Sequence, residues 1–338
     1  MRNRYAIVLA AGKGTRMKSK QYKVLHTVCG KPMVQHVLDS LKGIVGGQIV
    51  VIVGHGAEQV KEQLGSSVQY ALQEKQLGTA HAVLMSQDLL QHQTGATIIV
   101  SGDTPLIRSE TLEQLMEQHE KSQAAAVVLT AVLDDPTGYG RIIRTPDGFV
   151  ERIVEHKDAT ETERAVSEVS TGIFCFDNQA LFQALRQVKN DNAQGEYYLP
   201  DVIEIMRKAG RSISAFPTPA VEDGMGVNDR VQLAAVEKLL RARINEKHMR
   251  NGVTLVDPDS TYIDAEVVIG ADTVIHPGTF LRGSTCIGED CVIGPMADLS
   301  DCQADSKAMI SYTRLRKSHL RPSDTAVDHP LEGLLSTR

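Results

Sequence analysis

The 338-residue sequence contains no tryptophan, and only 4% of its residues are aromatic. It has no apolar run long enough to cross a membrane, so no membrane span is predicted. Its five cysteines are odd in number and scattered without a Cys-x-x-Cys pair, which indicates neither a zinc site nor a disulfide framework. The short apolar run near the N-terminus continues into a glycine loop and is not interpreted as a signal peptide. These absences favour a cytoplasmic protein.

The overall charge excludes one large class of partners. A net charge of −6 argues against general nucleic-acid binding, which needs a basic face. It is compatible with an anionic small ligand, because only the site itself must be positive. A length of 338 residues predicts about two domains, and a hydrophobic content of 42% is ample for their cores.

A glycine-rich loop follows the first predicted strand, the apolar run 5–10. Gly12 and Gly14 allow a sharp turn, and Lys13, Arg16 and Lys23 bring cations to the same place. This combination suits a triphosphate, because backbone amides and cationic side chains both bind phosphate oxygens. The loop fits neither the P-loop pattern nor Gly-x-Gly-x-x-Gly. Judged on its glycines alone, it could equally be an ordinary turn between a strand and a helix.

Strands and helices alternate along the first hundred residues. Apolar runs predict strands at 48–53, 68–72 and 97–101, and amphipathic stretches predict helices at 31–41, 58–64 and about 79–90. Such alternation predicts the α/β class: a Rossmann-like, mostly parallel, doubly wound sheet. Ligands of such sheets bind beyond the carboxyl ends of the strands, where the glycine loop and Asp103 are expected to lie. Further strands are predicted at 127–133, 140–144, 149–154 and 169–176.

A second domain is indicated by a six-residue repeat of aliphatic residues. This period predicts a short left-handed β-helix of hexapeptide repeats, with one aliphatic residue of each face pointing inward. The repeat stops where Asp305 occupies the next position, so about two coils are expected, followed by a poorly ordered or atypically packed tail. The predicted domains are 1–228, a connector helix at 229–251, the β-helix at 252–304 and the tail at 305–338. The repeating residues are Ile263, Ile269, Ile275, Leu281, Ile287, Ile293 and Leu299.

Two polar residues are candidates for binding a metal ion. Asp103 closes a predicted strand, and Asn228 precedes the connector helix. The inner face of that helix is predicted to consist of Val231, Ala235, Leu239 and Ile244. Asp103 and Asn228 could each instead be a helix cap, as could Asp229. One carboxylate and one amide oxygen suffice for Mg²⁺, which fills its remaining positions with phosphate and water.

Two further groups of residues are candidates for binding a base and a sugar. Gln73 could match the hydrogen-bonding edge of a pyrimidine beside the turn at Gly78 and Thr79. A purely structural role at the start of a helix explains these residues equally well. Polar groups at strand ends suit sugar hydroxyls and amides. The three sugar candidates are Gly140, Glu155 and Ser170. His81 and His156 are interpreted as structural.

Taken together, these strings resemble the bacterial bifunctional N-acetylglucosamine-1-phosphate uridyltransferase/glucosamine-1-phosphate acetyltransferase family. The resemblance runs from Ala6 to about Leu299. It implies that residues at matching positions have the same roles as in the family. It implies nucleotide binding by Leu9, Ala10, Ala11, Gly12 and Lys23, and uracil binding by Gln73, Gly78 and Thr79. It implies Mg²⁺ binding by Asp103 and Asn228, and amino-sugar binding by Gly140, Glu155 and the residue at 170. Arg16 and Lys23 are expected to be catalytic, stabilising charge on the transition state and on the leaving pyrophosphate.

The implied reaction is uridylyl transfer from UTP to N-acetylglucosamine-1-phosphate, a step of peptidoglycan and cell wall synthesis. The family has Asn where this chain has Ser170, which leaves another sugar-1-phosphate open as the substrate. The family's acetyltransferase part extends over further coils, so the chain is expected to be truncated and to lack acetyltransferase activity. The resemblance also implies a homotrimer formed through the β-helix, and a truncated β-helix would weaken that association. An alternative outside the enzymes is that the chain is a catalytically weak remnant that acts as a binding or assembly protein.

Overall fold

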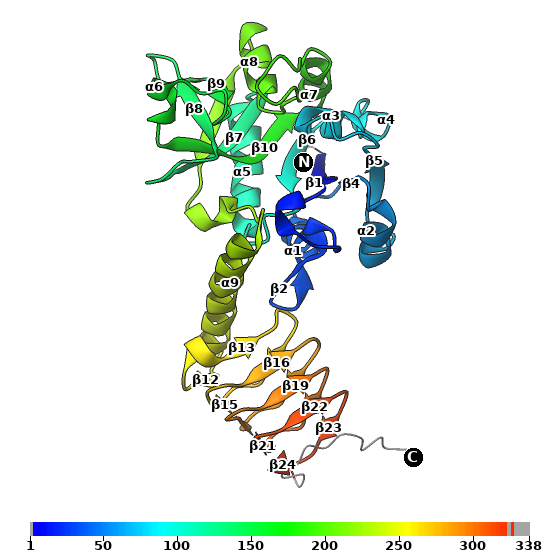
Figure 1. Cartoon of the computed structure of the whole chain (residues 1–338), viewed down its shortest axis with the longest axis vertical. Coiled ribbons are helices and arrows are strands. Elements are labelled where there is room, and N and C mark those ends of the chain that lie inside the picture. The colour runs from blue at the N-terminus through cyan, green and yellow to red at the C-terminus, as the bar shows by residue number, and fades with distance from the viewer. Residues whose placement is uncertain (1–2, 323–325, 328–338) are drawn as a thin grey trace. The chain divides into compact units, whose positions relative to one another are not determined.

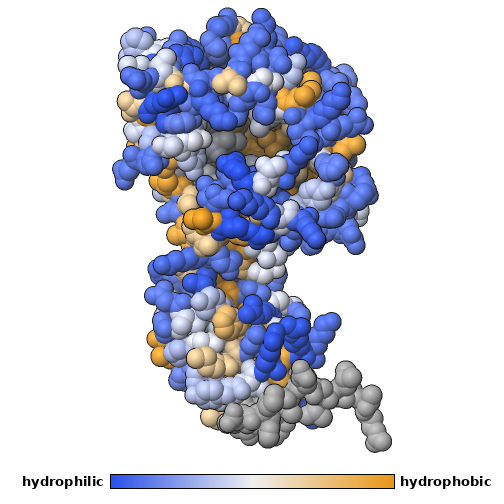
Figure 2. Space-filling model, viewed as in Figure 1, coloured by the Kyte–Doolittle hydropathy of each residue, from blue (hydrophilic) through white to orange (hydrophobic). Residues whose placement is uncertain are grey.

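The computed structural model describes residues 3–322 and 326–327 (Figure 1). Contacts along the backbone divide the chain into two compact units. Unit 1 spans Met1–His26 and Pro32–Gln232, and unit 2 spans Thr27–Lys31 and Leu233–Arg338. Within the described residues, no helix is both long and apolar enough to cross a membrane. The face seen in Figure 2 is largely hydrophilic.

Unit 1 is built on one sheet, which has nine strands within the described residues. Its main path runs β11-β7-β10-β6-β1-β4-β5, and β8 and β9 are attached to β10. Strands β1, β4, β5 and β6 are parallel to one another, whereas β10 is antiparallel to both of its neighbours on this path. The strands are β1 (Arg4–Ala10), β4 (Ile49–Val53), β5 (Gln69–Leu72), β6 (Ala96–Ser101), β7 (Ala126–Val132), β8 (Gly140–Arg144), β9 (Val150–Val154), β10 (Glu168–Asp177) and β11 (Ile213–Pro217).

Helices cover both faces of this sheet. Alternate residues of β1 enter two different cores: Ala6 and Val8 belong to one, and Ile7 belongs to the other. The first core is completed by α1 (Met33–Leu41), α2 (Ala57–Leu64) and α5 (Ser109–Ser122). The second is completed by α3 (Thr79–Leu84), α4 (Gln87–Leu90), α7 (Asn178–Leu185) and α8 (Asp201–Lys208). Because a β-strand turns successive side chains to opposite faces, one apolar strand serves both cores.

Shorter elements differ from the sequence-based prediction in two places. The single helix predicted at 79–90 is divided into α3 and α4, and between them Ser86 Oγ donates to the carbonyl of Val83. The helix predicted to begin at Lys31 begins at Met33, because β3 (Lys31–Pro32) pairs with β2 (Thr27–Val28). The remaining short helices of unit 1 are η1 (Thr15–Met17), η2 (Lys23–Leu25), α6 (Glu161–Arg164) and η3 (Val221–Gly224).

Most of α9 (Arg230–Arg250) belongs to unit 2, and its buried face differs in part from the predicted one: Ile244 packs against the core of unit 2 as predicted. Val231 is 80% exposed and Ala235 is exposed as well. The side chain of Asn245 is buried and donates to the carbonyls of Pro258 and Thr261, over 2.9 and 3.1 Å. Polar contacts of Asn245 to the chain that follows α9, together with the packing of Ile244, therefore select its inner face.

From Thr254 onward, the described residues of unit 2 form a left-handed β-helix. Its strands form three parallel sheets in which each strand pairs with the third strand after it. All seven predicted aliphatic residues lie in its core, none more than 7% exposed. The predicted fold class is thus confirmed for both parts of the chain. The strands are β12 (Thr254–Leu255), β13 (Tyr262–Ile263), β14 (Val268–Ile269), β15 (Val274–Ile275), β16 (Phe280–Arg282), β17 (Cys286–Ile287), β18 (Val292–Ile293), β19 (Asp298–Ser300), β20 (Gln303–Ala304), β21 (Met309–Ser311), β22 (Arg314–Arg316), β23 (His319–Leu320) and β24 (Ala326–Val327).

The coils continue beyond residue 304, where the sequence-based boundary was placed. The inward residues after Leu299 are Ala304, Ile310, Leu315 and Leu320, all buried in the same core. Their positions are five, six, five and five residues apart, so a strict period of six misses them. Turns shortened by one residue keep the inward residues stacked. The expectation of an atypical tail therefore fails for residues 305–322, and residues 323–325 and 328–338 lie outside the described residues.

Replacing Ile310 tests this extension of the coils. We expect Ile310→Ala to lower the free energy of unfolding by about 2 to 5 kcal/mol, because it removes a buried aliphatic side chain and leaves a cavity. Ile310 is 1% exposed, whereas the adjacent Met309 is 55% exposed. Met309→Ala is therefore the matched control, with an expected change within about 0.5 kcal/mol. Urea unfolding followed by circular dichroism measures both, and equal losses would contradict the extended coils.

Candidate active site

The loop after β1 lies against Lys23 at Gly14. Gly14 has a φ of +61°, and a Cβ placed on it would lie 2.5 Å from the Cβ of Lys23. Any other residue would be strained at this φ and would also collide with Lys23. Glycine at this position therefore lets the cationic loop lie against the segment that carries Lys23.

Lys23 joins the two residues that were predicted to bind a metal. Its Nζ donates a hydrogen bond to Oδ2 of Asp103 and another, over 3.2 Å, to Oδ1 of Asn228. Arg16 donates from Nη2 to the same Asn228 oxygen over 2.9 Å. The side chains of Lys23 and Asp103 are only 14% and 11% exposed, so water screens their attraction weakly. The structure thus brings Arg16, Lys23, Asp103 and Asn228 together at the carboxyl ends of β1 and β6.

The start of α9 decides between capping and binding for Asn228. Oδ1 of Asp229 accepts a hydrogen bond from the backbone N–H of Gln232 over 2.9 Å, which makes Asp229 the cap. Oε1 of Gln232 in turn accepts from the backbone N–H of Asn228 over 2.7 Å. The Asn228 side chain does not cap the helix, and its oxygen remains in the cluster with Lys23 and Arg16.

An ion pair between the half-exposed Arg108 and the buried Asp223 holds the segment before Asn228 against the segment after Asp103. The Asp223 side chain is fully buried and accepts from Nε and Nη2 of Arg108 over 2.9 and 3.1 Å. Thr111 Oγ1 donates to the same carboxylate. The backbone N–H of Val227 also donates to the carbonyl of Asp103 over 2.9 Å. These contacts fix the backbone on both sides of the cluster.

Gln73 and Gly78 are in direct contact. Nε2 of the buried Gln73 donates to the carbonyl of Gly78 over 3.0 Å. Gly78 has a φ of +112°, and a Cβ on it would lie 2.5 Å from the carbonyl oxygen of Tyr197. Thr79 Oγ1 accepts from the backbone N–H of Leu199 over 2.9 Å. The predicted base-binding residues thus form one packed group with the chain at 197–199.

The three predicted sugar-binding residues also converge. Ser170 on β10 is paired directly with Gly140 on β8, and a Cβ on Gly140 would lie 3.5 Å from Oε1 of Glu155. The pairing of β10 with β7 is irregular between Ser170 and Phe174, where Thr171 Oγ1 donates to the carbonyl of Leu129. This irregularity turns residues 170–172 toward the cavity described next.

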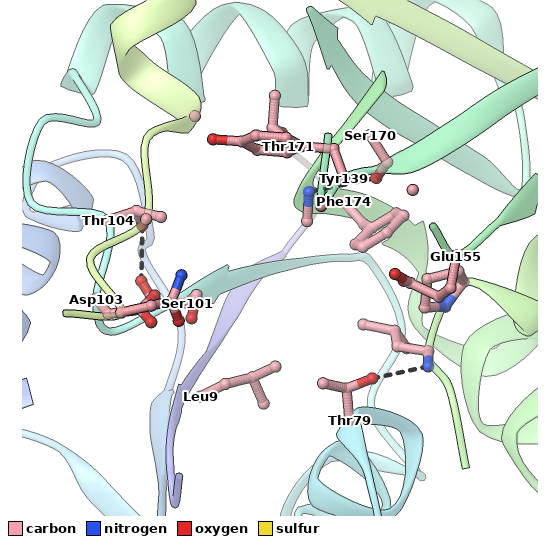
Figure 3. Close-up of a pocket in the computed structure, with 18 of the residues that line it drawn as sticks. Leu9, Thr79, Ser101, Asp103, Thr104, Tyr139, Glu155, Ser170, Thr171 and Phe174 are labelled. Atoms are coloured by element: carbon pink, nitrogen blue, oxygen red, sulfur yellow. Dashed lines mark hydrogen bonds between the residues drawn. The ribbon is translucent and has the colours of Figure 1, made fainter. Parts of the chain in front are cut away.

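A cavity of about 330 Å³ lies where these groups meet (Figure 3). All of its lining residues belong to unit 1. Figure 3 shows Asp103 and Glu155 on opposite sides of the cavity, with Leu9 and Thr79 along one wall. The predicted residues that line it are Leu9, Arg16, Thr79, Asp103, Gly140, Glu155, Ser170 and Asn228. The predicted residues outside its lining are Ala10, Ala11, Gly12, Lys23, Gln73 and Gly78.

The two ends of the cavity differ in charge. Arg16 and Lys23 lie at the Asp103 end. At the other end, burial raises the pKa of Glu155, and the carboxylates of Asp158 and Asp201 raise it further. Burial, together with Glu204 and Asp158, also raises the pKa of Asp201 to about 6. One end therefore favours an anionic group and the other disfavours it.

Several lining residues had no individual signal in the sequence. Thr137, Phe174 and Leu199 are ordinary residues of loops and strands, and only the fold brings them to the cavity. Gly138, Tyr139 and Gly226 stand beside residues that the sequence did single out. Proximity to a candidate motif was therefore the one sequence signal that could have found any of them.

Comparisons with known proteins identify the family of this chain. A family model described as "Nucleotidyl transferase" matches residues 5–221. The Bifunctional protein GlmU of Halalkalibacterium halodurans is 56% identical over 320 residues, which cover 95% of this chain and 70% of that protein. The Bifunctional protein GlmU of Geobacillus thermodenitrificans is 57% identical over the same length, with the same two coverages.

A solved structure supports the fold independently. The crystal structure of UDP-glucose pyrophosphorylase complexed with UDP-glucose matches with a TM-score of 0.60. The match covers 71% of this chain and 99% of that chain, at 15% sequence identity. At this identity the likeness shows the fold alone.

The ion pair of Arg108 with the buried Asp223 gives a test of how the site is held. We expect Asp223→Ala to lower the free energy of unfolding on the order of 2 kcal/mol, because Arg108 and Thr111 lose a charged acceptor. Glu110→Gln removes one negative charge from an exposed position in α5, beside Arg108, and is the control. Its expected effect is within about 0.5 kcal/mol. Thermal and urea unfolding measure both, and an Asp223→Ala protein as stable as the control would refute the anchoring role.

Proposed function

This chain belongs to the nucleotidyl transferase family, alongside the bifunctional proteins GlmU, and on that premise we propose its substrates. We propose that it transfers the uridylyl group of UTP to N-acetylglucosamine-1-phosphate, producing UDP-N-acetylglucosamine and pyrophosphate. Membership of the family confirms the predicted enzyme class, a nucleotidyltransferase. The observation that carries the proposal is the cluster of Lys23, Arg16, Asp103 and Asn228 at one end of a cavity.

The proposed reaction is a direct displacement at phosphorus. A phosphate oxygen of the sugar phosphate attacks the α-phosphorus of UTP, and the bond from that phosphorus to the pyrophosphate breaks. No protein nucleophile is needed, so the protein acts by positioning both substrates and stabilising charge. Lys23 and Arg16 supply positive charge where negative charge grows on the reacting phosphates and on the leaving pyrophosphate.

We propose that Asp103 and Asn228 hold Mg²⁺. Both residues present an oxygen to the ammonium group of Lys23, so their geometry already suits a cation. Two protein oxygens are few, which is typical of Mg²⁺ sites that are completed by phosphate and water. Within the described residues, no group of three or more His, Cys, Asp or Glu side chains forms an all-protein metal site. When bound, Mg²⁺ would supply neutralisation of phosphate charge at this end of the cavity.

The charge difference along the cavity supports the orientation of the sugar phosphate. Its phosphate group is drawn to the end with Arg16 and Lys23. The carboxylates around Glu155 disfavour an anion and can accept hydrogen bonds from sugar hydroxyl or amide groups. Ser170 lies at this neutral-to-acidic end, and its hydroxyl already accepts from the backbone N–H of Gly172 over 3.2 Å. We propose that Gly140, Glu155 and Ser170 contact the sugar.

The nucleotide is proposed to occupy the wall formed by the first strand and α3. Leu9, the first member of the predicted nucleotide loop, lines the cavity together with Thr79. Ala10, Ala11 and Gly12 continue from Leu9, and we propose that the loop they begin binds phosphate oxygens. Gln73 and Gly78 lie beside Thr79 and are proposed to hold the uracil.

Pyrophosphate release is the decisive assay. We expect release from UTP, Mg²⁺ and N-acetylglucosamine-1-phosphate, loss of release with EDTA, and slower release with glucose-1-phosphate. Asp103→Asn keeps the shape of the side chain but removes its charge, and we expect it to abolish turnover without unfolding the protein. A folded protein that releases no pyrophosphate would refute the proposed reaction. Faster release with glucose-1-phosphate would reassign the sugar.

Lys23 and Lys20 form a matched pair of lysines for a second test. We expect Lys23→Met to lower kcat by roughly a hundredfold, because it removes one preorganised charge from the reacting phosphates. Lys20 is exposed and, within the described residues, forms no ion pair, so Lys20→Met is expected to retain the wild-type rate. Steady-state kinetics with UTP measure both variants. Equal rates for the two variants would remove Lys23 from the proposed machinery.

A further inference from the structure

The side-chain amide of Gln73 is held by two neighbours. Its Nε2 lies 3.0 Å from the carbonyl oxygen of Gly78 and 3.0 Å from Nδ1 of His81. A backbone carbonyl can only accept a hydrogen bond, so the atom that faces Gly78 must be the amide nitrogen. The side chain is only 3% exposed, which leaves it little freedom to turn. The orientation of the amide is therefore defined.

This orientation defines the state of His81 as well. Because Nε2 of Gln73 donates, Nδ1 of His81 must accept, and the ring carries its proton on Nε2. Burial lowers the pKa of His81, which favours this neutral form. The ring of Tyr197 lies nearby, with the two ring centroids 6.5 Å apart. His81 thus has the protonation state that holds Gln73 in place.

The remaining atom of the amide is an acceptor without a partner. Within the described residues, Oε1 of Gln73 forms no hydrogen bond. Gly78 is followed by Thr79, which lines the cavity, so the amide lies beside the wall proposed to hold the base. Position N3 of uracil carries a hydrogen and donates, whereas N3 of cytosine has a lone pair and accepts. An acceptor oxygen that faces N3 therefore matches uracil and opposes cytosine.

We propose that His81, together with the carbonyl of Gly78, locks the Gln73 amide with its oxygen free, and that this selects uracil over cytosine in the bound nucleotide. His81 is then a positioning residue, because it acts on the base through Gln73. The inference rests on the proposed function, since it takes residues 73, 78 and 79 to hold the base. An amide without these contacts could rotate by half a turn and present its nitrogen to cytosine. The fixed orientation of the amide is therefore what produces the selectivity.

Two variants of His81 separate this role from simple packing. His81→Leu keeps much of the ring's volume but removes the acceptor at Nδ1. His81→Asn keeps a side-chain oxygen that can accept near the position of Nδ1. We expect His81→Leu to reduce the preference for UTP over CTP by about tenfold, the scale of one lost hydrogen bond. We expect His81→Asn to stay within about threefold of the wild-type preference.

The measurement is equilibrium binding of UTP and CTP by isothermal titration calorimetry. Calorimetry needs no turnover. A failure of the proposed reaction appears only in the pyrophosphate assay, and a failure of base selection appears in the binding data. An unchanged UTP-to-CTP ratio in folded His81→Leu would overturn the proposal, and so would wild-type protein that binds both nucleotides equally. If His81→Leu does not fold, wild-type binding of 3-methyl-UTP, which lacks the N3 hydrogen, decides the matter. Binding as tight as that of UTP would overturn the free acceptor on Gln73.

Discussion

The contact between the Lys23 ammonium and the oxygens of Asp103 and Asn228 connects three distant parts of unit 1. Lys23 follows the glycine loop, Asp103 follows β6, and Asn228 precedes α9. Charges held this far from water are costly unless they are paired, so the folded chain has to bring these segments together. Two further contacts help to hold these segments together: Arg108 pairs with Asp223, and Gly14 lies close against Lys23.

The cavity combines this cationic end with an acidic one. A sugar phosphate and a nucleoside triphosphate carry their charge at their phosphates, and their sugar and base need hydrogen bonds. A cavity lined by Arg16 at one end and Glu155 at the other therefore suits the chemistry of both proposed substrates. We place the selection of the base at a third position, beside Thr79, where the contacts of Gln73 leave one acceptor free.

Much of the site could be predicted, and the failures have a common cause. Asp103, Glu155 and Ser170 were found because polar residues at strand ends stand out against apolar strands. His81 was interpreted as structural, because its neighbour Gln73 lies eight residues away and only the fold turns the two side chains together. Asp223 and Arg108 are 115 residues apart, and no local pattern marks their pairing.

The sequence by itself determined the α/β class and the presence of a β-helix, and it supplied the candidates for the nucleotide loop and the metal site. Each of these depends on local periodicity or on residue types at fixed spacing, which are visible without contacts. The tertiary structure alone decided that the coils continue past residue 304, because the five-residue spacings after Leu299 keep the stacking while breaking the period. It also decided which face of α9 is buried and which atom of Gln73 is free, because those depend on neighbours that the fold supplies.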